Sequence, residues 1–365
     1  MRRMISVLTV LLLALAGFLY QVRLAGALPE LRGMLPLGCG LVLFAVSIFA
    51  FANGRVRVLL AAPWVHYCLA VVVLAALAIF GRRYRGGLYL PGRINPSEFV
   101  KLLFVLFAAG YLSRARTADG HLTLRKMAVF AAAFGLLVLE IAIVHDFGLL
   151  AQLAMTLAAM VFAMSWGWGF VVFAGVAVAA MAAMTYPVGH LAVRFSVWRD
   201  PFADITGAGW QTLQGLAALV SGGWWGKGIG LGEVHAVPIV SSDFVYVALA
   251  EEVGFIGCAF LLILWLFFFI LSLYPSFWGQ SPIQPRGQPP SGTAESGGQS
   301  LLAVGLVASL GIQLILNVAG VLNALPMTGI TLPLLSHGGS SLVAVLLMCA
   351  LVIICSERRK GDSER

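Results

Sequence analysis

The chain has 365 residues, of which 61% are hydrophobic and only 10% are charged. Soluble domains carry about 25% charged residues, so this composition excludes a soluble globular protein. The net charge of +8 comes largely from basic residues that flank apolar segments, and it does not require a nucleic-acid partner.

The apolar residues come in blocks of the length, about 20 residues, that a helix needs to cross a bilayer. The expected fold class is therefore an all-α integral membrane protein, a single polytopic domain over residues 1–365 with about ten transmembrane helices. A large extracytoplasmic loop, residues 188–243, is expected between helices 7 and 8. The ten predicted spans are 4–20, 35–52, 59–80, 97–113, 127–144, 147–164, 169–187, 244–273, 301–323 and 338–355.

Basic residues indicate the orientation, because they favour the cytoplasmic side of a membrane. With a cytoplasmic N-terminus, the inside segments hold 13 of the 23 Lys and Arg and the outside segments hold nine. We therefore expect both termini in the cytoplasm. The basic, apolar start also fits a cleaved signal peptide, but the topology needs no cleavage and we expect the first span to be retained. Residues 275–300, rich in Pro, Gly, Ser and Gln, predict a flexible cytoplasmic loop.

Charged residues within the apolar segments are the first candidates for a site, since charges at membrane depth usually mark a functional cavity. Glu98 and Lys101 are three residues apart and can form an ion pair on one helix face. Such a pair either fixes helix packing or lines a cavity that positions a substrate headgroup. Asp146 lies between two apolar blocks, where it is either a helix cap or a site residue. Asp243 stands at the mouth of an apolar run, after a glycine-rich loop with two tryptophans.

Two further segments point to a site at the outer membrane face. Residues 82–93 (RRYRGGLYLPGR) contain four arginines, which either reach lipid headgroups or bind a phosphate through paired guanidinium contacts. Residues 325–341 (LPMTGITLPLLSHGGSS) are rich in Pro, Gly and hydroxyl groups and predict a re-entrant loop that lines a cavity.

Other chemistries find little support in the sequence. The five cysteines lie within or at the ends of predicted spans, and the six histidines are scattered without metal-ligand spacing, which argues against a structural zinc site. The chain also lacks a phosphate-binding GxxxxGK[ST] loop, so ATP-driven transport by this chain alone is not expected.

Four blocks of the sequence together resemble the SEDS family (shape, elongation, division and sporulation) of rod-shape and septal cell-wall polymerases. INPSEFVKL is similar to the family's QPSE-x-x-K block, with Asn95 in place of glutamine, and HDFG is similar to PDLG, with His145 in place of proline. Two longer blocks match closely: GWQTLQGLAALVSGGWWGKGIGLG with SSDFVYVALAEEVGFIG, and PMTGITLPLLSHGGSSL, where His337 replaces a common tyrosine. The resemblance covers most of residues 80–356.

The resemblance implies an inverting peptidoglycan glycosyltransferase at the outer face of the bacterial cytoplasmic (inner) membrane. Its substrate would be lipid II, the undecaprenyl-pyrophosphate-linked disaccharide peptide. Asp243 matches the family's essential aspartate and is the expected general base. A class B penicillin-binding protein transpeptidase and other elongation or division proteins are the implied partners. A divalent cation, Mg or Mn, could bridge pyrophosphate oxygens, and no organic cofactor is expected.

The remaining charged positions are candidates for substrate binding. Arg93 matches a basic family position, and Arg85 and Lys227 are further cations that could hold the leaving pyrophosphate. The family usually has a tryptophan after Arg85, where this chain has Gly86. The full set of substrate-binding candidates is Arg85, Arg93, Glu98, Lys101, Asp146 and Lys227.

Two other functions remain open. A lipid II flippase or transporter would also use a polar cavity with Glu98, Lys101 and Glu251, and headgroup movement would then depend on these charges. A non-catalytic scaffold for wall-synthesis partners is disfavoured by the presence of Asp243 and the arginines. The shared motifs do not distinguish elongation from division or sporulation.

Overall fold

The structure is a computed structural model. It describes residues 2–25, 31–51, 55–84, 87–91, 95–115, 123–164, 189–233, 241–278 and 294–356. The elements in chain order are α1 (Arg2–Ala25), α2 (Leu31–Ala50), α3 (Val56–Ala61), α4 (Pro63–Phe80), β1 (Arg82–Tyr84), β2 (Gly87–Tyr89), α5 (Ser97–Ala115), α6 (Leu124–Val144), α7 (Phe147–Ala163), α9 (Gly189–Arg199), the 3-10 helix η2 (Pro201–Asp204), α10 (Trp210–Gly222), α11 (Val245–Trp278), α12 (Ala294–Val321) and α13 (Gly339–Cys355).

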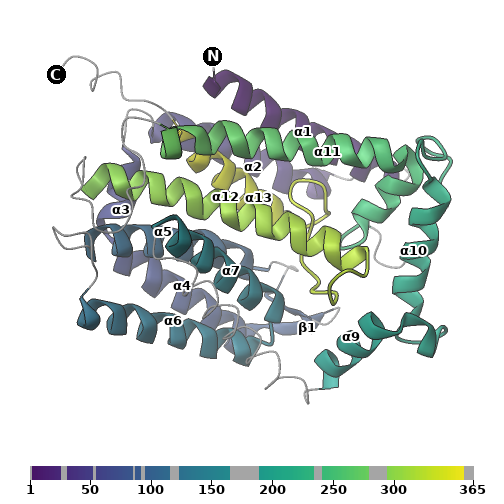
Figure 1. The fold of residues 1–365 in the computed structure, drawn as a ribbon, viewed down its shortest axis with the longest axis horizontal. Helices are drawn as coiled ribbons and strands as arrows, with labels where there is room; N and C mark the ends of the chain where they lie inside the picture. The colour runs from purple at the N-terminus through teal and green to yellow at the C-terminus, as the bar shows by residue number, and fades with distance from the viewer. Residues whose placement is uncertain are drawn as a thin grey trace.

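The long helices run side by side in one bundle, and α10 runs across the end of the bundle (Figure 1). Among the residues that the structure describes, five helices contain stretches long and apolar enough to cross a membrane, namely α1, α4, α6, α11 and α12, and α2, α7 and α13 hold shorter apolar stretches. The prediction of an all-α, multi-pass membrane protein is therefore confirmed.

The predicted spans correspond to helices wherever the structure describes them; the span at 169–187 lies outside the described residues. One predicted span, 59–80, is divided into α3 and α4 at Ala62. The division has a local cause, because Pro63 disfavours helical geometry in the residue before it. The sequence pattern did not reveal this break, since apolar residues continue on both sides.

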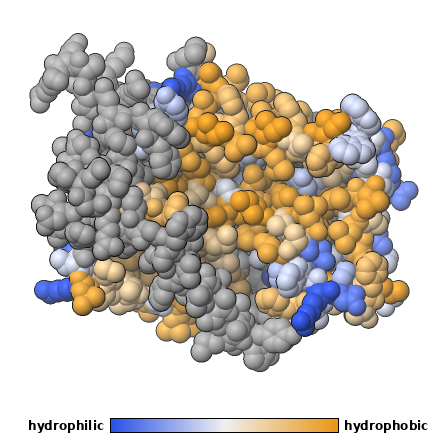
Figure 2. All heavy atoms as spheres, in the orientation of Figure 1, coloured by the Kyte–Doolittle hydropathy of each residue, from blue (hydrophilic) through white to orange (hydrophobic). Residues whose placement is uncertain are grey.

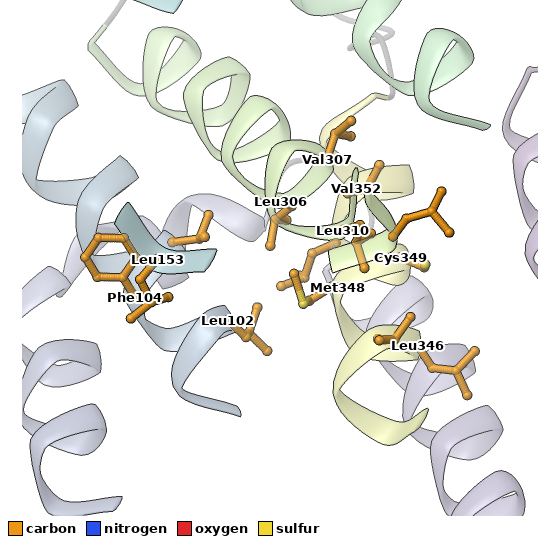
Figure 3. Close-up of a cluster of buried hydrophobic side chains, with 14 of the residues drawn as sticks. Leu102, Phe104, Leu153, Leu306, Val307, Leu310, Leu346, Met348, Cys349 and Val352 are labelled. Carbon is orange, nitrogen blue, oxygen red and sulfur yellow. The ribbon is translucent and has the colours of Figure 1, made fainter. Parts of the chain in front are cut away.

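Helix α5 lies at the centre of the bundle although it carries Glu98 and Lys101. Every residue from 100 to 110 is buried, and α5 packs against α4, α7, α12 and α13. Figure 3 shows part of the resulting core, in which side chains of α5, α7, α12 and α13 gather. The charges of α5 therefore stand in a protein interior, which makes their partners important for stability.

The polar segments contain more regular structure than the sequence indicates. The described part of the predicted extracytoplasmic loop, 188–243, includes α9, η2 and α10. Helices α11 and α12 extend into both ends of the predicted loop 275–300, to Trp278 and from Ala294. The strands β1 and β2 pair in antiparallel fashion, with Arg82 opposite Tyr89.

The outer surface fits a membrane environment. Hydrophobic side chains extend across the middle of the visible face and hydrophilic ones lie near its margins (Figure 2). Large apolar residues are exposed on several spans; on α11 they include Phe260, at 62% exposed, and Ile263, at 59%. In water such a surface would drive association, whereas hydrocarbon solvates it.

Candidate active site at the start of α11

Asp243 lies in the turn that leads into α11, and its side chain is half-buried. The hydroxyl of Ser242 donates a hydrogen bond to its Oδ1 atom at 2.6 Å. Phe244 and the first residues of α11, as far as Ala248, are all buried. The carboxylate is therefore attached to a fixed element of the core and not to a free loop.

The backbone of this turn is held at three successive carbonyl oxygens. The His337 N–H donates to Ser241 O at 2.7 Å, and the Ser336 hydroxyl donates to Ser242 O at 2.6 Å. The third carbonyl, that of Asp243, accepts from the side-chain amide of Asn317 at 3.0 Å. Two of these donors belong to the segment after α12 that the sequence predicts to line a cavity.

Gly329 in that segment lies directly beside Asp243. It has a φ of +74°, a conformation that favours glycine, and a Cβ there would stand 3.7 Å from Asp243 Oδ2. The same point is 3.7 Å from Nη2 of Arg194, so the carboxylate and the guanidinium are separated by at most twice that distance. Arg194 also donates to Thr328 O at 3.1 Å. Sequence reasoning missed Arg194, which it counted only as one basic residue of a long external segment.

Glu98 and Lys101 form the ion pair that their spacing predicts. The Lys101 ammonium lies 2.5 Å from Glu98 Oε2, with side-chain exposed fractions of 3% and 14%. The ammonium also donates to Oε1 of Gln313 on α12 at 3.0 Å. The prediction that the two charges pair is confirmed, and the pair is tied to a helix far away in the sequence.

Asp146 caps α7 and contacts the start of α5. Its Oδ1 atom accepts from Leu149 N at 3.0 Å, and its Oδ2 atom accepts from the Ser97 hydroxyl at 3.2 Å. Exclusion of water raises the pKa of the Asp146 carboxyl, and these hydrogen bonds oppose the shift. Asp146 is therefore a helix cap. It also contacts the start of α5, because its partner Ser97 is the residue before Glu98.

Lys227 is bound in another part of the molecule. Its ammonium lies 2.7 Å from Oε1 of Glu251, which is only 2% exposed. Glu251 is eight residues beyond Asp243, about 12 Å along a helix that rises 1.5 Å per residue. The structure therefore gives Lys227 a partner within the fold. Arg85 and Arg93 lie outside the described residues.

A cavity of about 360 Å³ adjoins the turn that carries Asp243. Polar groups on its wall come from Gln21, Ser241, Ser336 and His337, and most of the remaining lining is apolar and comes from α1, α2 and residues 334–342. Such a mixture of mainly apolar walls and a few polar groups is typical of ligand sites.

These features define a multi-pass membrane protein with a carboxylate site at one end of a helical bundle. The model of the FtsW, RodA and SpoVE family of cell cycle proteins matches residues 3–361, and the chain belongs to this family. The resemblance to cell-wall polymerases of the SEDS type is thereby confirmed.

Curated relatives and solved structures agree with this assignment. The chain is 34% identical over 275 residues to peptidoglycan glycosyltransferase RodA of Mycobacterium tuberculosis, which covers 72% of this chain and 55% of the relative. It is 33% identical over 273 residues to a probable peptidoglycan glycosyltransferase FtsW of Nitrosococcus halophilus, covering 72% and 65%. The chain thus spans about half the length of the mycobacterial relatives it matches.

Two solved structures share the fold. A chain of a peptidoglycan synthase complex superimposes with a TM-score of 0.74 at 24% identity, covering 98% of both chains. The rod shape determining protein RodA of Thermus thermophilus superimposes with a TM-score of 0.66 at 24% identity, covering 98% of this chain and 97% of the other.

Proposed function

We propose that this chain polymerises lipid II into peptidoglycan glycan strands at the outer face of the bacterial cytoplasmic membrane, with Asp243 as general base. The observation that carries the proposal is the placement of Asp243, a half-buried carboxylate whose backbone is held at three successive carbonyls. Relatives named peptidoglycan glycosyltransferases support the same activity.

The reaction needs a base because a sugar hydroxyl is a weak nucleophile. In the proposed step, the 4-hydroxyl oxygen of an incoming lipid II attacks the anomeric carbon of the glycan carried on undecaprenyl pyrophosphate. The bond from that carbon to the pyrophosphate oxygen breaks, and the carrier leaves with the electron pair. Asp243 takes the hydroxyl proton as the new β-1,4 bond forms with inversion. General base catalysis of this kind contributes about 10²–10⁴-fold.

The leaving pyrophosphate needs positive charge as it departs. Arg194 lies close to Asp243, since a Cβ on Gly329 would stand 3.7 Å from both Arg194 Nη2 and Asp243 Oδ2, and we add it to the proposed candidates Arg85, Arg93 and Lys227. A Mg or Mn ion remains part of the proposal, as a partner of the pyrophosphate oxygens. Among the residues that the structure describes, no three His, Cys, Asp or Glu side chains are grouped to hold a metal, so we assign no step to the ion.

In the proposal, Glu98, Lys101 and Asp146 form a polar surface on one side of the site. Glu98 and Lys101 pair at the start of α5. Asp146, at the start of α7, accepts a hydrogen bond from Ser97, the residue before Glu98. The cavity between α1, α2 and residues 334–342 would suit part of a lipid-linked sugar, because it combines apolar walls from spanning helices with polar groups near Asp243.

A class B penicillin-binding protein transpeptidase is the proposed partner. The fold neighbour from a peptidoglycan synthase complex supports an assembly of this kind. The proposed docking face is on α11 and α12, where α11 exposes Phe260 and Ile263. Cytoplasmic termini complete the proposal and follow from the distribution of basic residues.

The test is lipid II polymerisation by purified chain in liposomes, with and without the transpeptidase. Asp243→Asn preserves the shape and the backbone contacts but removes the proton acceptor, so polymer should fall at least about 100-fold at an unchanged melting temperature. Asp200→Asn, on an exposed aspartate that caps η2, is the matched control. Full polymerisation by Asp243→Asn would exclude Asp243 as the base.

A transport function is the competing proposal, because the buried pair of Glu98 and Lys101 would also suit passage of a headgroup. Movement of labelled lipid II across the same liposomes separates the two functions. Headgroup movement by wild type without polymer, lost in Lys101→Met, would favour transport.

A further inference from the structure

One face of α12 carries a row of buried polar side chains that reaches from the Glu98–Lys101 pair to Asp243. Gln313 and Asn317 are four residues apart, so they lie on the same side of the helix. Their exposed fractions are 0% and 2%. Buried amides cost stability unless they are hydrogen-bonded. Gln313 Oε1 also accepts from Nε2 of Gln152 on α7 at 3.5 Å, and the other bonds that these two amides make lead to the candidate site.

Gln313 connects Lys101 to the segment beside Asp243. Its Oε1 atom accepts from the Lys101 ammonium at 3.0 Å. Its Nε2 atom donates to the carbonyl of Thr331 at 3.1 Å and is 3.3 Å from the Thr331 hydroxyl. The cation at Oε1 fixes the orientation of the amide, because only the oxygen can accept from an ammonium.

Asn317 connects the same segment to Asp243. Its Nδ2 atom donates to Ile330 O at 2.7 Å and to Asp243 O at 3.0 Å. Both hydrogens of the amide are thus used on backbone carbonyls, one from each of the two chain segments that meet at the site. Its Oδ1 atom is buried and has no hydrogen-bond partner among the residues that the structure describes. A leucine would avoid that cost, so stability alone does not explain an asparagine here.

We propose that Gln313 and Asn317 are positioning residues that hold the base Asp243 at a fixed position relative to the Glu98–Lys101 pair. The connection runs from Lys101 through Gln313 to Thr331, and from the neighbouring Ile330 through Asn317 to Asp243. Neither amide is accessible enough to contact substrate, so each acts through the groups it holds. The inference rests on the proposed function, because it gives Asp243 the part of the base.

The test compares variants on the same helix in the lipid II polymerisation assay. Asn317→Leu removes both donors to the carbonyls, and Gln313→Met removes the hydrogen bonds of Gln313 to Lys101 and Thr331, together with its contact with Gln152, at similar volume. Gln299→Leu is the matched control, because Gln299 is also on α12 and its side-chain nitrogen has no partner among the described residues. Since a displacement of about 1 Å at a catalytic group can cost 10²-fold, we expect kcat to fall about ten- to a hundredfold in both site variants, with KM within about twofold.

Several outcomes decide the matter. Asn317→Leu with a kcat equal to that of Gln299→Leu overturns the inference. A loss that appears only in KM also overturns it, since positioning of the base acts on the chemical step. If Asn317→Leu does not fold, Asn317→Asp carries the same test, because it exchanges the donating group for an acceptor at nearly the same volume. The double variant of Gln313 and Asn317 should lose less than the product of the single losses, since both act on one segment.

A failure of the proposed function would give a different result from a failure of this inference. If wild type forms no polymer under any condition, the proposed activity is wrong, whereas the hydrogen exchange of residues 328–336 still reports the positioning. That exchange should rise in Asn317→Asp and Gln313→Met relative to Gln299→Leu. Unchanged exchange in both variants would contradict the inference independently of activity.

Discussion

Gly226 and Gly254 approach each other so closely that neither position has room for a Cβ atom. A Cβ on Gly254 would collide with the backbone nitrogen of Gly226, and a Cβ on Gly226 would collide with the carbonyl oxygen of Glu252. Gly254 also interrupts α11, with φ 69° and ψ −176°. The close approach therefore occurs where the helix that begins beside Asp243 is broken.

The loop before α11 restores the backbone hydrogen bonds that this break removes. Lys227 N and Gly228 N donate to the carbonyls of Glu251 and Glu252, each at 2.9 Å, and Phe255 N donates to Gly223 O at 2.9 Å. Ile256 N donates to Trp224 O at 3.2 Å. Irregular backbone at membrane depth requires such partners, so the loop and the first part of α11 form one unit.

The first prediction concerns Gly254→Ala. Gly254 has a positive φ, and the new methyl group would collide with the backbone of Gly226. The free energy of unfolding should therefore fall by about 1–3 kcal/mol or more. Gly135→Ala is the control, since Gly135 lies in α6 with open space around it and alanine favours a helix by about 0.5–1 kcal/mol. Thermal unfolding of both variants in one detergent measures the difference. Equal melting temperatures would show that the break does not depend on glycine.

The second prediction concerns the Glu98–Lys101 pair. Glu98→Gln or Lys101→Met alone leaves one charge in the interior, which costs about 3–5 kcal/mol in comparable buried pairs. The double variant leaves no charge and should be more stable than either single variant. If it also regains polymerisation, the pair serves packing; if it regains stability without activity, the pair serves the substrate. Three variants as stable as wild type would contradict an energetically important pair.

The third prediction concerns Lys227. Its side chain is 34% exposed, so water can partly replace it at Glu251 and Lys227→Met should lower the melting temperature less than Lys101→Met does. Lys227→Arg keeps the charge and should restore most of the loss. A large rise in KM for lipid II at an unchanged melting temperature would instead indicate contact with the pyrophosphate.

The sequence predicted what depends on local spacing. A spacing of three residues on a helix brings Glu98 and Lys101 together. The apolar blocks predicted the spans, including α5 with its two charges. The glycine in Val253–Gly254–Phe255 gave no sign of a break, because the break depends on hydrogen bonds from residues 223–228. The sequence did not predict a role for Gln313 or Asn317 for a similar reason. Their hydrogen-bond partners, Lys101 on α5 and the carbonyl of Asp243, are far from them in the sequence. Arg194 becomes a candidate site residue only through the fold, which brings it close to Asp243.

The last prediction concerns the external arginines Arg85 and Arg93, which we propose as contacts of the leaving pyrophosphate. Alanine at either position should remove a charge-assisted hydrogen bond worth about 1.5–3 kcal/mol, or about ten- to a hundredfold in turnover at saturating lipid II. Arg82→Ala is the control, because Arg82 is exposed in β1, and it should have a small effect. Arg93→Lys should restore only part of the rate, since an ammonium lacks the fork that holds two phosphate oxygens. Equal, small losses at all three positions would show general attraction to headgroups and exclude a specific phosphate site.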